Sequence, residues 1–229
     1  MKYLSALLTQ ASGSLGGATA AKNRGGNYLR AKIAPVQPRT VAQQEQRANL
    51  AALAGAWKAL TQAQIAGWNS LASTLTLQDP LGNSYVPTGE QIYVGNNRNL
   101  SQAAETSVED PPTAKPDFAD ITPVGMTAVS GGTPSMTATT ALAAAPTENV
   151  FIVRATPMIS AGISFIGASR YRIIGHFAAS TYASMNILAD YQAKFGDLVS
   201  GAKIGLAVDM VSIATGFAST RATTSVIVT

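Results

Sequence analysis

The spacing of apolar residues changes along this chain, and that change constrains the fold more than any other feature. Between residues 41 and 101 apolar side chains recur at intervals of three and four, the period of an amphipathic helix. From about residue 124 they alternate or form short runs between glycines and prolines, which is typical of strands. Residues 103–123, rich in proline and acidic residues, separate the two patterns. We therefore predict an α+β chain: helical unit 41–102, linker 103–123 and all-β domain 124–229.

Residues 1–40 precede the helical pattern, and we interpret them as an extended basic arm. Its glycines permit positive φ angles and remove side-chain packing, so this stretch is not expected to form a core of its own. Residues 1–60 carry a net charge of +7, whereas residues 61–120 carry −5. A basic segment of this kind favours contact with an acidic surface, either nucleic acid or another subunit. The residues we expect to contact a partner are Lys22, Arg24, Tyr28, Arg30, Lys32 and Arg39.

The first eight residues are mostly apolar but do not match a secretory signal. Their apolar run is interrupted by Ser5 and is short for the 7–15 residues that a signal peptide requires. We expect a short element that docks through Tyr3, Leu4, Leu7 and Leu8. No stretch of the sequence reaches the ~18 apolar residues of a membrane span, so we predict no membrane partner.

Three segments begin with the same local signal, Thr-x-x-Gln. In a capping box of this form the threonine oxygen accepts a bond from the fourth residue's N–H, and the glutamine side chain reaches back. The signal predicts helices over roughly 41–59, 62–74 and 89–101. We expect Trp57, Trp68 and Tyr93 to be structural anchors, because large aromatic side chains at helical spacing are usually core residues.

The region after residue 124 predicts about seven strands with no helix between them. A continuous apolar run, Val150–Val153, indicates a strand in the middle of a sandwich, and residues 203–210 alternate strictly. Seven short strands in about 105 residues are typical of an immunoglobulin-like or fibronectin-III-like sandwich. The predicted strands are 126–129, 135–142, 149–155, 170–177, 181–188, 202–211 and 220–228.

The inventory of chemically active side chains is small. The chain has no Cys and one His, His176, which excludes disulfides, thiolate metal sites and His-cluster metal sites within one chain. We expect His176 to be a strand residue on the same face as Arg172 and Ile174. The glycine pairs match neither a P-loop nor a dinucleotide fingerprint. We predict no enzyme, and no catalytic, cofactor-binding or metal-binding residue.

Several motifs, in order, resemble a group of tailed-bacteriophage virion structural proteins of poorly defined role. The resemblance covers roughly residues 10–112. Its motifs include Ser12–Gly17, Asn23–Arg30, Pro35–Thr40, Trp57–Gln64, Ala66–Asn69, Asp79–Gly82 and Gly89–Val94. It implies a non-enzymatic virion protein bound to other virion subunits. We also expect a homo-oligomer. The position in the particle (capsid, neck or tail) is left open by the resemblance.

Within that class we favour a capsid decoration or cement protein that stabilises the particle through its arm. The alternatives are a neck or tail accessory protein, such as an adaptor or fibre-attachment protein, and a DNA-associated protein inside the head. A secreted carbohydrate-binding module is a further hypothesis. It is disfavoured because residues 124–229 contain no Trp and their aromatic residues are scattered along the sequence.

Overall fold

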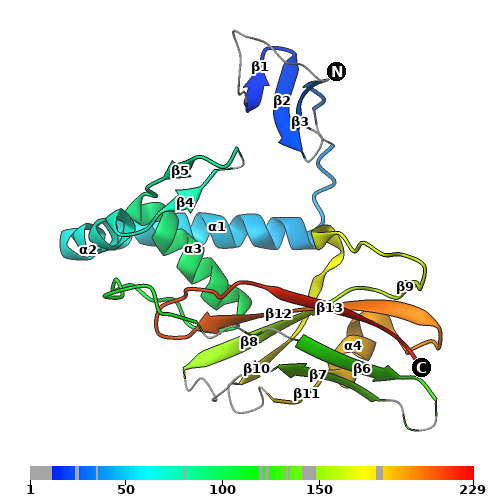
Figure 1. The fold of residues 1–229 in the computed structure, drawn as a ribbon. Helices are drawn as coiled ribbons and strands as arrows, with labels where there is room; N and C mark the ends of the chain where they lie inside the picture. Colours follow the sequence, from blue (N-terminus) through cyan, green and yellow to red (C-terminus); the bar gives the residue numbers. More distant parts are fainter. Residues whose placement is uncertain are drawn as a thin grey trace. The chain divides into compact units, whose positions relative to one another are not determined.

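The computed structural model describes residues 12–23, 26–34, 36–79, 81–118, 121, 124–131, 133, 135–140, 148–178 and 183–229. The chain divides into two compact units, Met1–Ile92 and Tyr93–Thr229. The described part contains four α-helices and several antiparallel sheets, so the predicted α+β class is confirmed (Figure 1). None of its helices has the length and hydropathy needed to span a membrane. The predicted docking element at residues 3–8 lies outside the described residues.

Within residues 1–40, where we expected an extended basic arm, the described part of the first unit begins with a three-stranded antiparallel sheet. Its strands are β1 (Gly13–Leu15), β2 (Ala18–Asn23) and β3 (Gly26–Ala31), in the order β1-β2-β3. Gly16 lies in the turn between β1 and β2 with a φ of +56°, a conformation that favours glycine. The glycines therefore form turns of a meander as well as limiting side-chain packing.

Two helices and a hairpin follow. They are α1 (Val41–Ala59), α2 (Gln62–Ser73), and the two-residue strands β4 (Leu77–Gln78) and β5 (Ser84–Tyr85). Helix α3 (Gly89–Gln102) begins in the first unit and ends in the second. These bounds confirm the three predicted helices to within one residue.

The capping boxes explain why the first residues of these helices could be predicted from the sequence. In α2 the Thr61 hydroxyl oxygen accepts from the Gln64 N–H at 3.3 Å, and the Gln64 side chain accepts from the Thr61 N–H at 2.9 Å. The same pair of bonds joins Thr88 and Gln91 at the start of α3. Each box satisfies two of the N–H groups that a helix end leaves without intrahelical partners.

The second unit contains two antiparallel sheets. One has the strand order β10-β8-β12-β13, with β9 also paired to β12, and the other has the order β11-β7-β6. Thr229, after β13, donates its N–H to Ala128 of β6 at 3.1 Å and accepts from Ser130 N–H at 2.8 Å, which joins the two sheets along one edge. The strands are β6 (Val124–Val129), β7 (Ser135–Thr140), β8 (Asn149–Ala155), β9 (Ile159–Ser160), β10 (Arg172–Ala178), β11 (Met185–Asn186), β12 (Ala202–Ser212) and β13 (Ala222–Ile227).

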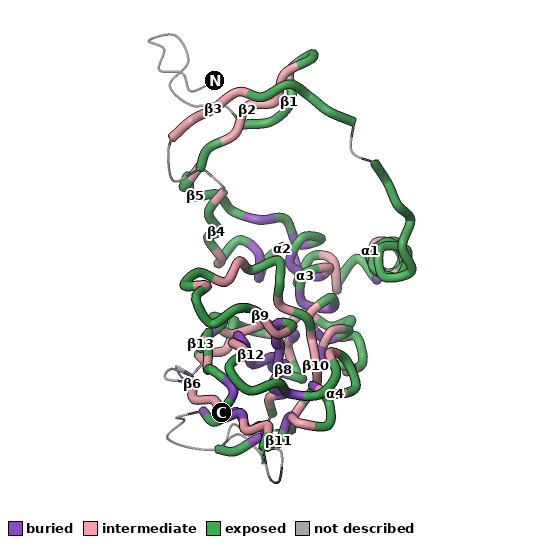
Figure 2. The backbone as a smooth tube through the Cα atoms, turned by 90° about the vertical axis from the view of Figure 1, so that its right-hand side faces the viewer, coloured by how far each residue is buried: buried purple, intermediate pink, exposed green. Residues whose placement is uncertain are grey.

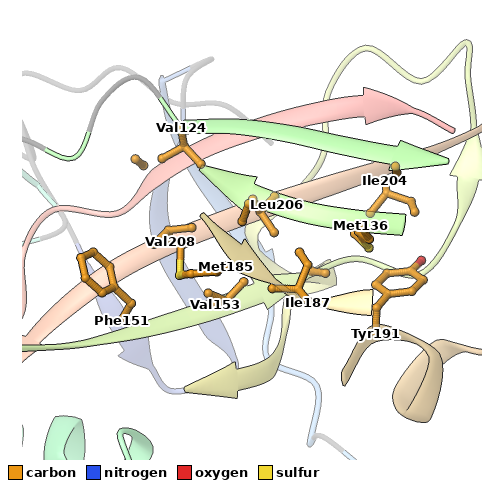
Figure 3. Packing of buried hydrophobic residues seen from close by; sticks show 14 of the residues in the cluster. Val124, Met136, Phe151, Val153, Met185, Ile187, Tyr191, Ile204, Leu206 and Val208 are labelled. Atoms are coloured by element: carbon orange, nitrogen blue, oxygen red, sulfur yellow. The ribbon is translucent and has the colours of Figure 1, made fainter. Parts of the chain in front are cut away.

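The central strands β8 and β12 are buried on both faces (Figure 2). Their inner face packs against the second sheet, with Phe151, Val153 and Leu206 among the core side chains in Figure 3. Their outer face carries Val150, Ile152 and Val211. These side chains pack with Leu100, in the last turn of α3, and with Ala103 just after the helix. Burial on both faces is why the apolar run at Val150–Val153 is continuous, as in other doubly covered strands.

The expectation of an all-β second part was wrong between β11 and β12, where the chain forms a helix. The predicted strand 181–188 is reduced, within the described residues, to the two residues of β11, followed by helix α4 (Leu188–Phe195). Tyr191 on α4 is fully buried, and its hydroxyl donates to the Thr156 carbonyl at 3.2 Å. An eight-residue helix with no side-chain N-cap bond leaves little local signal in the sequence.

The expected face of His176 was also wrong, because β10 contains a register shift. Along β10, Ile173 is paired with Arg154 and Gly175 with Val153, so Ile174 is the extra residue. After the shift His176 is paired with Ile152 and lies on the outer face with Ile173, whereas Ile174 and Phe177 pack on the core. His176 is exposed. When side chains are assigned to faces by strict alternation, a bulge places every later side chain on the face opposite to the expected one.

Polar side chains of α3 attach its second half to the loop between β12 and β13 and to the segment that follows the helix. Asn96 and Asn99 donate to the carbonyls of Thr215 and Gly216 at 2.9 and 3.0 Å. Buried Asn97 donates to the Val108 carbonyl at 3.0 Å and accepts from the Val108 N–H at 2.7 Å. The compact units consequently divide within α3, at residues 92 and 93, where the sequence suggested a division after residue 102. The four-part division into 1–40, 41–102, 103–123 and 124–229 stays a prediction.

Candidate assembly surface

Three of the expected partner-contact residues lie in the β1–β3 sheet, and they are divided between its two faces. Directly paired residues of an antiparallel sheet share a face. Tyr28 is paired with Ala21 and Arg30 with Thr19, so Tyr28 and Arg30 lie on one face. Lys22, paired with Asn27, lies on the opposite face. The structure therefore brings Tyr28 and Arg30 together and separates Lys22 from them.

The other expected contact residues lie outside the strands. Lys32 follows β3 and is exposed, and its N–H donates to the Gly17 carbonyl at 2.8 Å. Arg39 is exposed with a φ of +51°, immediately before the Thr40 cap of α1. Arg24 lies outside the described residues.

None of the described residues from 12 to 59 whose burial is assigned is buried. Helix α1 extends over 19 residues and has no buried side chain, and Leu50 on it is 54 % exposed. The segment between β3 and α1 exposes two more large apolar side chains, Ile33 at 81 % and Val36 at 89 %. These two were missed by the sequence reasoning, which followed charge along the arm and gave no weight to apolar residues outside a periodic pattern.

Two of the three expected anchors are buried. Trp68 on α2 is 0 % exposed within the first unit, and Tyr93 on α3 is 1 % exposed within the second. Burial, and then the charge of Glu109, raise the pKa of Tyr93 above its usual range. Trp57 is only half-buried. The difference between the indoles follows from their helices, because α2 has three buried residues and α1 has none.

One further feature of the second unit, an ion-paired network on the outer sheet face, gave no signal in the sequence. Arg154 of β8 donates to the carboxylate of Asp209 on β12, and its other terminal nitrogen donates to Gln102 of α3 at 3.1 Å. Arg221 reaches the same carboxylate at 3.4 Å. Burial, and then the charges of Arg221 and Arg98, lower the pKa of Arg154 to about 10. Fifty-five residues separate the two main partners in sequence, so local patterns do not connect them.

Within the described residues no group of three or more His, Asp and Glu side chains could hold a metal ion. Asp79 is used structurally, because its carboxylate accepts the N–H groups of Leu81 and Asn83 at 2.8 and 2.9 Å in the β4–β5 turn. Those bonds, with a side-chain bond from Asn83, hold the pKa of Asp79 below its usual range. Comparison with protein-family models, curated proteins and solved structures finds no match to this chain.

Proposed function

We propose that this chain is a non-enzymatic structural protein of a tailed-bacteriophage virion. Within that class we favour a capsid decoration or cement protein whose N-terminal unit attaches it to neighbouring subunits. The observation that carries the proposal is the lack of any buried residue among the described residues between 12 and 59 whose burial is assigned. The order of motifs over residues 10–112 supports the same class of protein.

Secondary structure without a core of its own needs a partner to be stable. Most helical stability in proteins comes from tertiary packing of the apolar face and not from helix propensity. Small sheets likewise need an apolar face packed on something to be stable. Helix α1 and the β1–β3 sheet meet neither condition with their own described side chains. Subunits of a particle supply the missing surface.

The charge of this segment sets the chemistry of the partner. Residues 1–60 carry +7, and an acidic or mixed protein surface complements them. The same charge separation lets the basic first part of one copy meet the acidic residues 61–120 of another, which carry −5. We therefore expect a homo-oligomer that contacts other virion proteins.

We further propose that the second unit is an immunoglobulin-like or fibronectin-III-like sandwich with a helix inserted before its sixth strand. Numbering β6, β7, β8, β10, β11, β12 and β13 from one to seven, the sheet orders are 5-2-1 and 4-3-6-7. Immunoglobulin-type sandwiches likewise place strands A, B and E in one sheet and C, F and G in the other. Tyr191, which precedes the sixth strand and donates to a backbone carbonyl, occupies a position similar to the tyrosine corner.

The decisive experiment is incorporation into particles. A chain lacking residues 1–40 should fold, as judged by circular dichroism, yet be absent from purified virions. A full-length variant with an exposed second-unit substitution, Val199→Ser, is the matched control and should be incorporated normally. Normal incorporation of the truncated chain would overturn the proposal. Labelling the incorporated protein in electron micrographs distinguishes the capsid from the neck and tail.

A DNA-associated protein inside the head is the second candidate, because Tyr28 and Arg30 share a face of the β1–β3 sheet. Such a pair can stack on a base and contact a phosphate. Filter binding to duplex and single-stranded DNA over a range of salt concentrations tests it, since phosphate contacts make the affinity fall steeply with salt. A flat salt dependence would remove this candidate.

A further inference from the structure

We propose that a groove on the outer face of the second unit, between the loop 163–171 and β13, binds an uncharged pyranose sugar. The groove has a volume of about 270 Å³. Its walls are Ser164, Phe165 and Ile166 on one side, Tyr171 at the base, and Thr223–Ser225 of β13 on the other. The proposal goes beyond the structural role argued above and does not depend on it.

A glycine on β12 makes room for the base of the groove. Gly205 is paired with Ser225, and a Cβ at Gly205 would lie 2.8 Å from the Cδ1 of Ile166 and 3.0 Å from the Tyr171 hydroxyl. Both side chains therefore lie directly over the backbone of β12. The Lys203 ammonium donates to the Ile163 carbonyl at 2.8 Å, which holds the start of the loop against the same strand.

The lining offers hydroxyl groups and no charge. Four of the lining residues offer a hydroxyl on this face, namely Ser164, Tyr171, Thr223 and Ser225, whereas Thr224 is paired with the core residue Leu206 and lies on the other face of β13. Within the described part of the chain none of these four hydroxyls forms a hydrogen bond with another residue. Hydroxyls act as both donors and acceptors, so together they match the alternating demands of a sugar's own hydroxyl groups. Phosphates, carboxylates and cations find no complementary charge on these walls.

An exposed aromatic ring completes the site. Phe165 is 82 % exposed, the most exposed large apolar side chain among the described residues of the second unit. The face of an aromatic ring is electron-rich, and it attracts the weakly positive C–H groups on the apolar side of a pyranose. An apolar plane beside several hydroxyls suits a ligand that is apolar on one side and polar at its edge. The volume, slightly below the roughly 300–1,000 Å³ of drug-sized sites, suits one ring and not an extended chain.

Saturation-transfer NMR on the full chain tests the proposal with four free sugars: glucose, galactose, N-acetylglucosamine and rhamnose. We expect transfer to the ring protons of at least one of them, with a Kd on the order of 1 mM. Phe165→Ala should weaken that binding about five- to tenfold by removing the stacking plane. Thr223→Val, which keeps the shape and removes the hydroxyl, should weaken it severalfold.

The matched control is Ile213→Ala, an exposed apolar residue just beyond the opposite end of β12, which should leave the transfer unchanged. Absence of transfer to all four sugars from a folded chain would overturn the proposal. So would full transfer in Phe165→Ala. Self-association that Phe165→Ala abolishes, with no sugar transfer, would assign the ring to a protein contact and would equally overturn it.

Discussion

Replacing Asp209 by Asn should be among the most destabilising single changes in the second unit. The side chains of Asp209 and Arg154 are each 8 % exposed, and the carboxylate is the acceptor for both Arg154 and Arg221. Removing its charge leaves the Arg154 guanidinium buried, with Arg221 and Arg98 nearby and only neutral acceptors around it, the amide oxygens of Gln102 and of the new Asn. Breaking a buried pair in this way costs about 3–5 kcal/mol in the free energy of unfolding.

The loss in the free energy of unfolding on removing an ion-pair partner depends on how exposed that partner is. The Arg221 side chain is 42 % exposed, so Arg221→Ala should cost at most about 1 kcal/mol. The double change Arg154→Met with Asp209→Leu removes both charges and fills the space with apolar atoms. It should restore most of the stability that Asp209→Asn loses, because the desolvation of two ions is no longer required.

Urea unfolding followed by circular dichroism measures these free energies, and hydrogen exchange of the β8 and β12 amides locates the loss. A loss below about 1 kcal/mol for Asp209→Asn would refute the reasoning. So would a double variant as unstable as the single one, because the cost would then reflect shape and not charge.

Three further changes test other parts of the structure. Burial raises the pKa of Tyr191 to about 12, so the unfolded chain ionises first and stability should fall as pH rises from 10 to 12. Tyr191→Phe should remove that part of the alkaline loss and, at neutral pH, cost about 1 kcal/mol for the bond to Thr156, as measured by urea unfolding. Gly216→Ala should lower the melting temperature more than Gly201→Ala; both have positive φ, but only at Gly216 would a Cβ meet Asn96, 2.6 Å from its carbonyl oxygen. Thr61→Ala should cost about 1 kcal/mol in chemical unfolding through loss of the capping box, and unchanged stability would contradict that assignment.

Features encoded within a few residues of sequence were predictable. The Thr-x-x-Gln signals located three helix starts because the capping bonds are contained in four residues, with both halves of the box in α2 and α3 and the Thr40 half in α1. The β4–β5 hairpin is local in the same sense, since Asp79 and Gly82 form its turn. Strands β8 and β12 could be predicted from the sequence because burial favours apolar side chains along most of their length.

Features that depend on distant parts of the chain were not predictable from local pattern. The bulge in β10 depends on how that strand pairs with β8, and it moved His176 to the face opposite the expected one. The Arg154–Asp209 pair joins strands far apart in sequence. Likewise the groove lined by Phe165 and Tyr171 forms only where the loop 163–171 meets β13, a contact that local patterns do not encode.

The small number of charged residues in α1 supports our proposal that a partner covers the N-terminal part of the chain. A helix that is permanently exposed usually carries many charged residues and i, i+4 ion pairs. Over its 19 residues α1 has only Glu45, Arg47 and Lys58, and Arg47 is engaged with Gln37 just before the helix. The rest is largely alanine and glutamine around a half-exposed Leu50. Such a helix gains little from water and little from the described side chains of its own chain, and this is the basis of our proposal that another subunit covers it.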